Sequence, residues 1–343
     1  MARDLSRLLR PRSVAVFGGG WAENMVRACR AMGFEGAVWP VHPRREAMAG
    51  VPCLPDLDAL PAAPDAAFVA VNRTASVEVV AALSAMGAGG AVAFASGFSE
   101  TADGAAREAA LVAAAGAMPV LGPNCYGMLN YLDGAALWPD VHGGARVARG
   151  VAFVSQSSNL ALNVTMQRRG LPLAQAICVG NQAQTGVAEI VAALAADPRI
   201  TAIGLYLEGL RDPAGFAAAA AEAKAAGKPV VALRSGRSAA ARAAALSHTA
   251  SIAGDDAAAR AFFRRAGVPL ARSLPELLDA LHLLHLGGPL PRPEIVAMSC
   301  SGGEAGLAAD AAEARGTPLA AFGAETRAAV AEALGPMITP ANP

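Results

Sequence analysis

The stretch Ser13-Val14-Ala15-Val16-Phe17-Gly18-Gly19-Gly20 decides the fold of this chain. Its apolar, partly β-branched run is typical of a buried strand, and the three glycines that follow favour a tight turn. A helical spacing of apolar residues then extends over residues 23–32. The stretch therefore predicts a strand, a glycine turn and a helix, which is the building unit of a parallel α/β sheet.

The same unit recurs along the first part of the chain. Further strand-like runs lie at residues 37–41, 66–71, 91–95 and 120–121, and alanine-rich helical stretches lie at 75–86 and 105–117. Apolar strands that alternate with helices predict a parallel sheet covered on both faces. Right-handed crossovers place the loops after the strands along one edge, where such sheets bind ligands. These loops are residues 18–21, 42–45, 72–74, 96–99 and 122–126.

A second alternating set follows a break in the pattern. Its strand-like runs lie at residues 151–154, 176–179, 200–207 and 229–233. After a proline-rich linker at 287–293, a third start offers two strands and two helices, too few to close a stable sheet. We expect an α/β domain at 1–129, a connection at 130–150, a second α/β domain at 151–286 and an incomplete third domain at 287–343.

The composition narrows the class of protein. A chain of 343 residues exceeds what one hydrophobic core usually holds, so we expect two or three domains. Lysine plus arginine equals aspartate plus glutamate at 28 each, which gives no global electrostatic argument for nucleic acid or an anionic membrane. The charge balance does not argue against a small-molecule ligand. Aromatic residues make up only 5%, so we expect close-packed cores of small side chains.

The cysteine pattern and the lengths of the apolar runs indicate the cellular compartment of the protein. The five cysteines form no Cys-X-X-Cys pair and their number is odd, which argues against a disulfide framework or a zinc cluster. Leucines surround His282 and His285, so we interpret these two as helix-surface residues rather than metal ligands. We recognise no signal core and no spanning run of about 18 apolar residues. We expect a soluble, cytoplasmic protein without a metal site.

The loops of the first domain favour a phosphate-containing ligand over NAD. The glycine loop lacks the spacing of the dinucleotide fingerprint, and no acidic residue follows the second strand, which argues against a nicotinamide oxidoreductase. The strand is followed instead by His42-Pro43-Arg44-Arg45, a basic cluster suited to a ribose phosphate, although a solvated arginine pair would have the same sequence. A helix N-terminus beside the glycine loop can take a pyrophosphate.

A loop of the second domain contains a candidate catalytic histidine. The segment Leu246-Ser247-His248-Thr249-Ala250-Ser251-Ile252-Ala253-Gly254 places an imidazole among small side chains, just before a helix that begins near Asp255 and Asp256. Such an imidazole can act as a base, a metal ligand or a nucleophile. A loop histidine that hydrogen-bonds a neighbouring carbonyl is an equally good interpretation of the spacing.

Short motifs in a fixed order give the chain a family resemblance. They are Val16-Phe17-Gly18, Trp39-Pro40-Val41-His42-Pro43, Ser96-Gly97-Phe98, Gly122-Pro123-Asn124-Cys125-Tyr126-Gly127, Ser155-Gln156-Ser157, Gly180-Asn181-Gln182, Tyr206-Leu207-Glu208 and Ser247-His248-Thr249. Over essentially its whole length, the chain resembles the CoA-binding portion of the NDP-forming (ADP-forming) acyl-CoA synthetases, relatives of the succinyl-CoA synthetase α subunit. The resemblance implies a Rossmann-like CoA-binding domain followed by flavodoxin-like domains of the succinyl-CoA synthetase type, the last one incomplete.

The resemblance implies an acid–thiol ligase that joins a carboxylic acid to coenzyme A while a nucleoside triphosphate is cleaved to its diphosphate and phosphate. The intermediates are an acyl phosphate and a phosphohistidine, and His248 matches the phosphorylated position. Glu208 matches the carboxylate that orients this histidine. Ser157, Ser158 and Asn159 match a helix start whose N–H groups hold the phosphoryl group. Without the resemblance, they would be an ordinary strand-end carboxylate and a helix N-cap.

The resemblance also assigns the CoA path to the first domain. Gly18, Gly19 and Gly20 would permit close approach of the pyrophosphate, and Arg44 or Arg45 would meet a phosphate. The residues that would line the pantetheine path are Asn72, Ser96, Gly97 and Asn124. We interpret Cys125 as a packing residue, because no histidine neighbours it in the sequence.

We recognise no ATP-grasp domain in this sequence, so the resemblance implies that ATP or GTP and Mg²⁺ bind to an ATP-grasp domain or β-type subunit elsewhere. The chain would be a fragment of a longer fused protein or an α-type subunit, and we expect an oligomer. A catalytically silent CoA-binding sensor or scaffold is the alternative, but retention of Glu208 and His248 favours the enzyme.

The acid itself remains open in the sequence. Where relatives have a lysine-containing turn, this chain has Gly20-Trp21-Ala22-Glu23-Asn24, and Ser158-Asn159 replaces a glycine-small pair. Drift or a redirected acyl pocket would explain these departures. Large aromatic side chains favour a larger or aromatic acyl group over acetate only loosely; they are Trp21, Tyr126, Tyr131 and Trp138.

Overall fold

The fold is described from a computed structural model of the whole chain. The structure describes residues 3–101, 103–238, 241, 256–292 and 294–335. The chain divides into two compact units, Met1–Gly288 and Pro289–Pro343, and each is described by itself.

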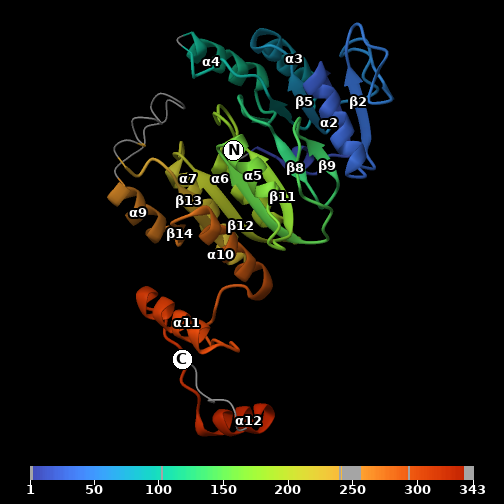
Figure 1. Cartoon of the computed structure of the whole chain (residues 1–343). Coiled ribbons are helices and arrows are strands. Elements are labelled where there is room, and N and C mark those ends of the chain that lie inside the picture. Colours follow the sequence, from blue (N-terminus) through green and yellow to red (C-terminus); the bar gives the residue numbers. More distant parts are fainter. Residues whose placement is uncertain (1–2, 102, 239–240, 242–255, 293, 336–343) are drawn as a thin grey trace. The chain divides into compact units, whose positions relative to one another are not determined.

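The first unit begins with a five-stranded parallel sheet of order β2-β1-β5-β6-β7 (Figure 1). Its strands are β1 (Ser13–Gly18), β2 (Ala37–Val41), β5 (Ala66–Ala70), β6 (Ala91–Ala93) and β7 (Val120–Leu121). Alternate residues of β1 pack into two different hydrophobic cores, one on each face of the sheet. Val14 and Val16 pack with helix α2 (Gly20–Ala31). Ala15 and Phe17 pack with α3 (Arg73–Met86) and α4 (Gly104–Ala115). The predicted sheet with helices on both faces is confirmed.

Helix α2 starts earlier than the apolar pattern indicates. The pattern predicts a start near residue 23, whereas the helix begins at Gly20 with Gly19 as its N-cap. The N–H of Glu23 already donates to the carbonyl of Gly19, so the glycines form the first helical turn. Apolar spacing could not report this turn, because glycines bury no side chain. The sequence also gave no sign of helix α1 (Ser6–Leu9) or of the hairpin β3 (Ala47–Met48) and β4 (Val51–Pro52).

The second sheet of this unit has seven strands in the order β14-β13-β12-β10-β11-β8-β9. They are β8 (Met128–Asn130), β9 (Ala135–Leu137), β10 (Gly150–Ser155), β11 (Leu173–Cys178), β12 (Ile200–Leu207), β13 (Val230–Arg234) and β14 (Leu270–Ala271). Strands β10 to β13 are parallel, as predicted, and β14, for which the sequence analysis had no strand, adds a fifth parallel strand. The helices are α5 (Ser158–Thr165), α6 (Val187–Ala196), α7 (Pro213–Ala225), α9 (Asp256–Arg265) and α10 (Leu274–Gly287).

Strands β8 and β9 tie the two sheets into one core. Residues 130–150, for which the sequence predicts only a connection, contain β9 and the first residue of β10. The two strands pair antiparallel with each other, and β8 pairs antiparallel with β11. On the other side, the Sγ of Cys29 on α2 hydrogen-bonds the carbonyl of Ala136 on β9 at 3.4 Å. One hydrophobic core therefore runs from α2 through these strands into the second sheet, which fixes the two sheets relative to each other.

The second unit contains little buried apolar surface. Its helices are α11 (Gly302–Arg315) and α12 (Ala324–Leu334). The two strands that the sequence predicts in this unit do not form, because the described residues make only one parallel bridge there, Ile295 with Leu319. A strand needs neighbours, and the described part of this unit offers none beyond that bridge. Met298 and Leu307 are correspondingly 92% and 70% exposed.

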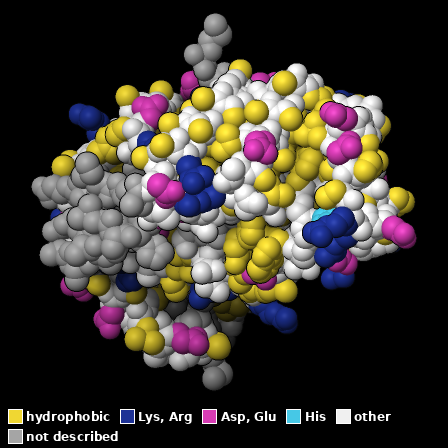
Figure 2. Space-filling view, turned by 90° about the horizontal axis from the view of Figure 1, so that it is seen from above, with side chains coloured by type: hydrophobic (Ala, Val, Ile, Leu, Met, Phe, Trp, Pro, Cys, Tyr) yellow, Lys and Arg dark blue, Asp and Glu magenta, His cyan; other side chains and the backbone are white. Residues whose placement is uncertain are grey.

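The described surface carries mixed charge. On the face shown in Figure 2, acidic and basic side chains are interspersed with hydrophobic ones, in keeping with a formal net charge of zero. None of the described helices combines the length and apolar character that crossing a membrane requires.

Candidate functional site

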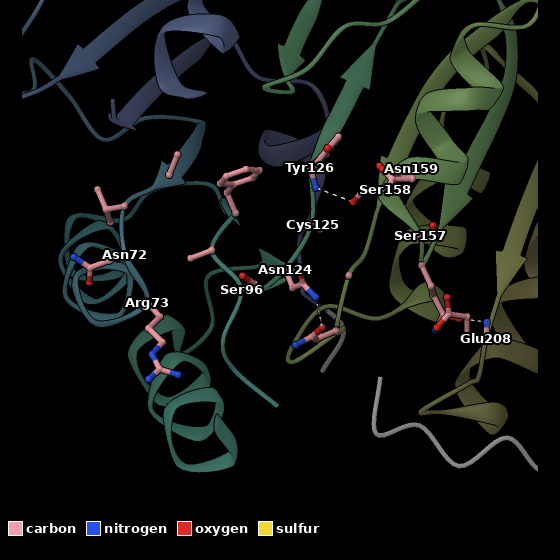
Figure 3. Close-up of a pocket in the computed structure, with 17 residues that line it drawn as sticks. Asn72, Arg73, Ser96, Asn124, Cys125, Tyr126, Ser157, Ser158, Asn159 and Glu208 are labelled. Atoms are coloured by element: carbon pink, nitrogen blue, oxygen red, sulfur yellow. Dashed lines mark hydrogen bonds between the residues drawn. The ribbon is translucent and has the colours of Figure 1, made fainter. Parts of the chain in front are cut away.

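A cavity of about 680 Å³ opens where the strands of both sheets reach their carboxyl ends (Figure 3). The loops that line it follow β5, β6 and β7 in the first sheet and β10, β11 and β12 in the second. In both sheets the parallel strands run second, first, third, fourth, fifth, and such sheets bind ligands in the crevice beside the strand where the order reverses. The cavity joins these two crevices.

The cavity brings together seven of the residues that the sequence analysis singled out. They are Asn72, Ser96, Asn124, Ser157, Ser158, Asn159 and Glu208. It also takes in residues to which no role had been assigned, which are Arg73, Phe94, Gln156 and Asn181. Gln156 and Asn181 lie inside quoted motifs, so their neighbours pointed to them. Arg73 followed a predicted strand and Phe94 lay within one, at 91–95, and neither carried a further signal.

The start of helix α5 is held open toward the cavity. Ser157 is the N-cap, and its Oγ accepts from the N–H of Leu160 at 3.3 Å. The hydroxyl of Ser155 accepts from the N–H of Ser157 at 3.0 Å and donates to its carbonyl at 2.7 Å. Among the described residues, the N–H groups of Ser158 and Asn159 have no partner. Free N–H groups at a helix start attract an anion.

Gln156 clamps the turn that carries Glu208. Its Oε1 accepts from the N–H groups of Glu208 and Gly209, the latter at 3.1 Å. Its Nε2 donates to the carbonyl of Gly209 at 2.8 Å. Glu208 is half-buried just after β12, and the clamp fixes its backbone beside the start of α5 (Figure 3).

A hydrogen-bonded wall closes the other side of the cavity. The N–H of Tyr126 donates to Oγ of Ser158 at 3.0 Å. Asn124 lies opposite Asn181, with Nδ2 to Oδ1 at 3.4 Å, and Asn181 donates to Oγ of Ser99 at 3.0 Å. Gly180 permits this approach, because its φ is +49° and a Cβ there would lie 2.3 Å from the carbonyl oxygen of Pro123.

Two further polar residues of the cavity are already engaged within the first domain. Oδ1 of Asn72 accepts from the N–H groups of Thr74 and Ala75, so this side chain caps α3 and leaves only its amide nitrogen for a ligand. Arg73 forms an ion pair of 3.2 Å with Asp103 and donates to the carbonyl of Gly97 at 2.8 Å.

Several predicted site residues lie outside the cavity lining. Gly18, Gly19 and Gly20 form the end of β1 and the start of α2, and Gly97 follows the cavity residue Ser96. Arg45 forms a 2.8 Å ion pair with Glu23 in the first turn of α2, whereas Arg44 is exposed. His248 lies outside the described residues, as does the first of the two aspartates expected to open its helix. Helix α9 begins at the second, Asp256.

The thiol in the cavity wall is protonated and buried. Cys125 is 2% exposed, and burial raises its pKa to about 12. A thiol with that pKa is not a nucleophile at neutral pH, which agrees with the interpretation of Cys125 as a packing residue. Among the described residues, no group of three or more histidine, cysteine, aspartate or glutamate side chains has the arrangement of a metal site.

Comparisons with known proteins match each of the two sheets to a domain family. The CoA binding domain family matches residues 12–131, and the Succinyl-CoA ligase like flavodoxin domain family matches residues 148–284. Trans-feruloyl-CoA synthase FCS1 of an unknown prokaryotic organism is 33% identical, over 99% of this chain and 50% of that protein. The chain spans about half the length of this and several other curated relatives.

Two further relatives match this chain over most of their own length. The alpha subunit of ADP-forming acetate–CoA ligase II from Pyrococcus furiosus is 31% identical, over 99% of this chain and 75% of that subunit. The apo form of Ca. Korarchaeum cryptofilum dinucleotide forming acetyl-coenzyme A synthetase 1 superposes with a TM-score of 0.88 at 27% identity, over 99% of this chain and 75% of that one. These matches confirm the resemblance seen in the motifs. The chain therefore belongs to the family of ADP-forming acyl-CoA ligases, of which it represents the CoA-binding, α-type portion.

Proposed function

We propose that this chain, together with an ATP-grasp domain or subunit, joins a carboxylic acid to coenzyme A while ATP or GTP is cleaved to its diphosphate and phosphate. One observation carries the proposal: a single cavity contains loops of the CoA-binding sheet, the open start of α5 and Glu208. A thioester centre and a phosphoryl-binding centre would then share one cavity, as a ligase requires.

The proposed chemistry passes through His248. An imidazole nitrogen of His248 attacks the γ-phosphorus of the nucleotide, and the diphosphate leaves. A carboxylate oxygen of the acid then takes the phosphoryl group, and the imidazole is released. Finally the sulfur of CoA, having lost its proton, attacks the acyl carbon, and inorganic phosphate leaves.

The roles of the cavity residues follow from where charge develops. The free N–H groups of Ser158 and Asn159 and the Ser157 cap would hold the phosphoryl oxygens without a cation. Glu208, whose backbone Gln156 holds, would accept a hydrogen bond from the N–H of the distal ring nitrogen of His248 and so fix its tautomer. These assignments rest on the shared cavity and on the family to which the chain belongs.

CoA would extend from the cavity across the carboxyl edge of the first sheet. Its thiol end would lie beside Asn124 and Ser96, with Asn72 and Gly97 farther along the pantetheine. Its pyrophosphate would meet the glycine turn at Gly18, Gly19 and Gly20, where a Cβ on either of the last two would meet nothing within 4 Å. Arg45, or Arg44 beside it, would contact a phosphate, and Arg45 would then exchange its ion pair with Glu23.

The nucleotide and Mg²⁺ belong to a partner in this proposal. Two of the relatives are named as alpha subunits of ADP-forming acetate–CoA ligases, which favours an ATP-grasp domain or β-type subunit beside this chain. The relatives' names leave the acid open, because they include acetate, 4-hydroxybutyrate and ferulate derivatives.

The test is phosphorylation of this chain. The chain is incubated with its ATP-grasp domain or subunit and ATP labelled in the γ-phosphate. We expect an acid-labile, base-stable label that His248→Asn abolishes and that acid plus CoA discharge. His282→Asn, on α10, is the control and should label normally. CoA binding without any label on His248 would refute the ligase and favour a CoA-binding sensor or scaffold.

A further inference from the structure

The cavity has an aromatic wall in a chain that is poor in aromatic residues. Phe94 and Tyr126 both line it, with ring centroids 6.1 Å apart and planes inclined at 36°. Trp21 packs on the outer side of Phe94 at 5.7 Å, and Trp138 meets Tyr126 edge-on at 5.2 Å. Phe68 supports Phe94 from the core at 5.7 Å. We call Phe94 and Tyr126, with Trp21 beside them, the aromatic wall.

The sequence analysis had grouped these residues differently. Tyr131 and Trp138 were taken with Trp21 and Tyr126, yet both are fully buried and neither lines the cavity. Phe94, which the sequence did not single out, connects Trp21 to Tyr126. The wall is therefore assembled from three separate parts of the chain, the first turn of α2, the loop after β6 and the loop after β7.

One hydrogen bond connects the aromatic wall to the proposed phosphoryl site. The N–H of Tyr126 donates to Oγ of Ser158 at the start of α5. Tyr126, whose backbone makes this bond, and Phe94, whose ring centroid lies 6.1 Å from that of Tyr126, both line the cavity into which this helix start opens. The remainder of the acyl group, which must leave the helix start in some direction, meets aromatic faces on this side.

The rings are fixed in place before any ligand binds. The hydroxyl of Tyr126 hydrogen-bonds Asp140, and burial together with this carboxylate raises its pKa, so the phenol stays neutral. Trp138, which is fully buried, and Phe68 hold Tyr126 and Phe94 from behind. Trp21 is 49% exposed, an unusually open position for an indole that already stacks on another ring. Rigid aromatic surface beside a polar cavity suits an apolar, planar ligand group.

We propose that the acid which this chain joins to CoA is aromatic, with its ring packed against Phe94 and Tyr126, and that these two residues select it over acetate. The inference rests on the proposed function, because it assumes that the acyl group forms at the start of α5. Aromatic pairs prefer offset or edge-to-face contact and add about 0.5–1.5 kcal/mol each beyond burial. Acetate has no ring to make such contacts.

Titration calorimetry on the full chain tests the inference without turnover. The probes are free CoA, acetyl-CoA, benzoyl-CoA and cinnamoyl-CoA. We expect the two aryl thioesters to bind about tenfold more tightly than acetyl-CoA, from ring contacts with two side chains. Equal affinities for acetyl-CoA and both aryl thioesters, with CoA bound, would overturn the inference and leave the proposed function standing. No binding of any probe would overturn both.

Variants separate an acyl site from a pantetheine site. Phe94→Leu and Tyr126→Leu should each reduce the preference for aryl over acetyl thioesters about threefold or more, with the affinity for free CoA unchanged. Phe34→Leu is the matched control, a partly buried phenylalanine outside the cavity, and should retain the full preference. A uniform loss of affinity for all four probes would mean that the wall holds pantetheine, and would refute the inference. The wild-type ratio decides the matter even if a variant fails to fold.

Discussion

The backbone N–H of Tyr126 donates a 3.0 Å hydrogen bond to Oγ of Ser158, and this bond joins the CoA-binding part of the chain to the start of helix α5. Tyr126 follows the last strand of the first sheet, whereas Ser158 follows the first parallel strand of the second sheet. The bond therefore links the two parts of the cavity lining at the point where acyl and phosphoryl chemistry are proposed to meet.

Removing the acceptor of this bond should weaken the contact. Ser158→Ala leaves the N–H of Tyr126 without its partner, so we expect a loss of about 1–2 kcal/mol in the free energy of unfolding. Urea unfolding followed by circular dichroism measures it. Asn163→Ala, an exposed change on the same helix, should stay within about 0.5 kcal/mol. Equal losses in the two variants would show that the bond contributes nothing.

Gln156 should act on turnover through Glu208 rather than on CoA binding. Gln156→Ala frees the Glu208–Gly209 turn, and a misplacement of about 1 Å at a reacting group costs on the order of 100-fold in rate. We expect that loss in the rate of His248 phosphorylation with the ATP-grasp partner, with the CoA dissociation constant within about twofold of wild type. Gln156→Glu keeps an acceptor oxygen for the two N–H groups but loses the Nε2 donor to the carbonyl of Gly209, so it should fall in between. Parallel losses in CoA affinity and rate would point to a general structural role instead.

Local patterns predicted the sheets but not the pairing of distant side chains. Strands β2 and β12 begin and end where the sequence indicates, because buried parallel strands read as apolar runs bounded by polar loops. The sequence could not indicate that Arg45 pairs with Glu23, because that contact depends on how β2 packs beside α2. The clamp between Gln156 and residues 208–209 is hidden for the same reason.

The sequence predicted those residues of the candidate site that lie in the quoted motifs or directly beside them. Ser157, Ser158, Asn159 and Glu208 were named from motifs, and the structure brings them into one cavity with Asn124. Phe94 was not named, since a phenylalanine inside the predicted strand 91–95 looks like an ordinary core residue. Only the fold reveals that the first turn of α2 and the loops after β6 and β7 bring their rings together beside the start of α5.

A partly buried cluster of Arg199 with two aspartates should make stability depend on pH. Arg199 bonds Asp133 at 2.7 Å and Asp197 at 2.9 Å; burial opposes ionisation of both carboxyls, but the hydrogen bonds from Arg199 outweigh it and lower their pKa values. A lowered pKa stabilises the fold above the unfolded value near 4, and the contribution is lost as pH falls through the folded value. We expect Arg199→Met to lower the melting temperature at pH 7 and to lose most of that deficit near pH 3. A deficit that stays constant with pH would mean that packing, not ion pairing, accounts for it.

Alkylation rates should distinguish the buried thiol of Cys125 in the cavity wall from the exposed thiol of Cys300. Cys300 is exposed, whereas Cys29, Cys125 and Cys178 are buried, and burial raises the pKa of each of these three. Because alkylation requires an accessible thiolate, iodoacetamide at pH 8 should label Cys300 first and Cys125 only in denaturant. Peptide mass spectrometry after timed exposure measures the order. If native Cys125 were labelled as fast as Cys300, its thiol would be open to the cavity and partly ionised, and its interpretation as a packing residue would be wrong.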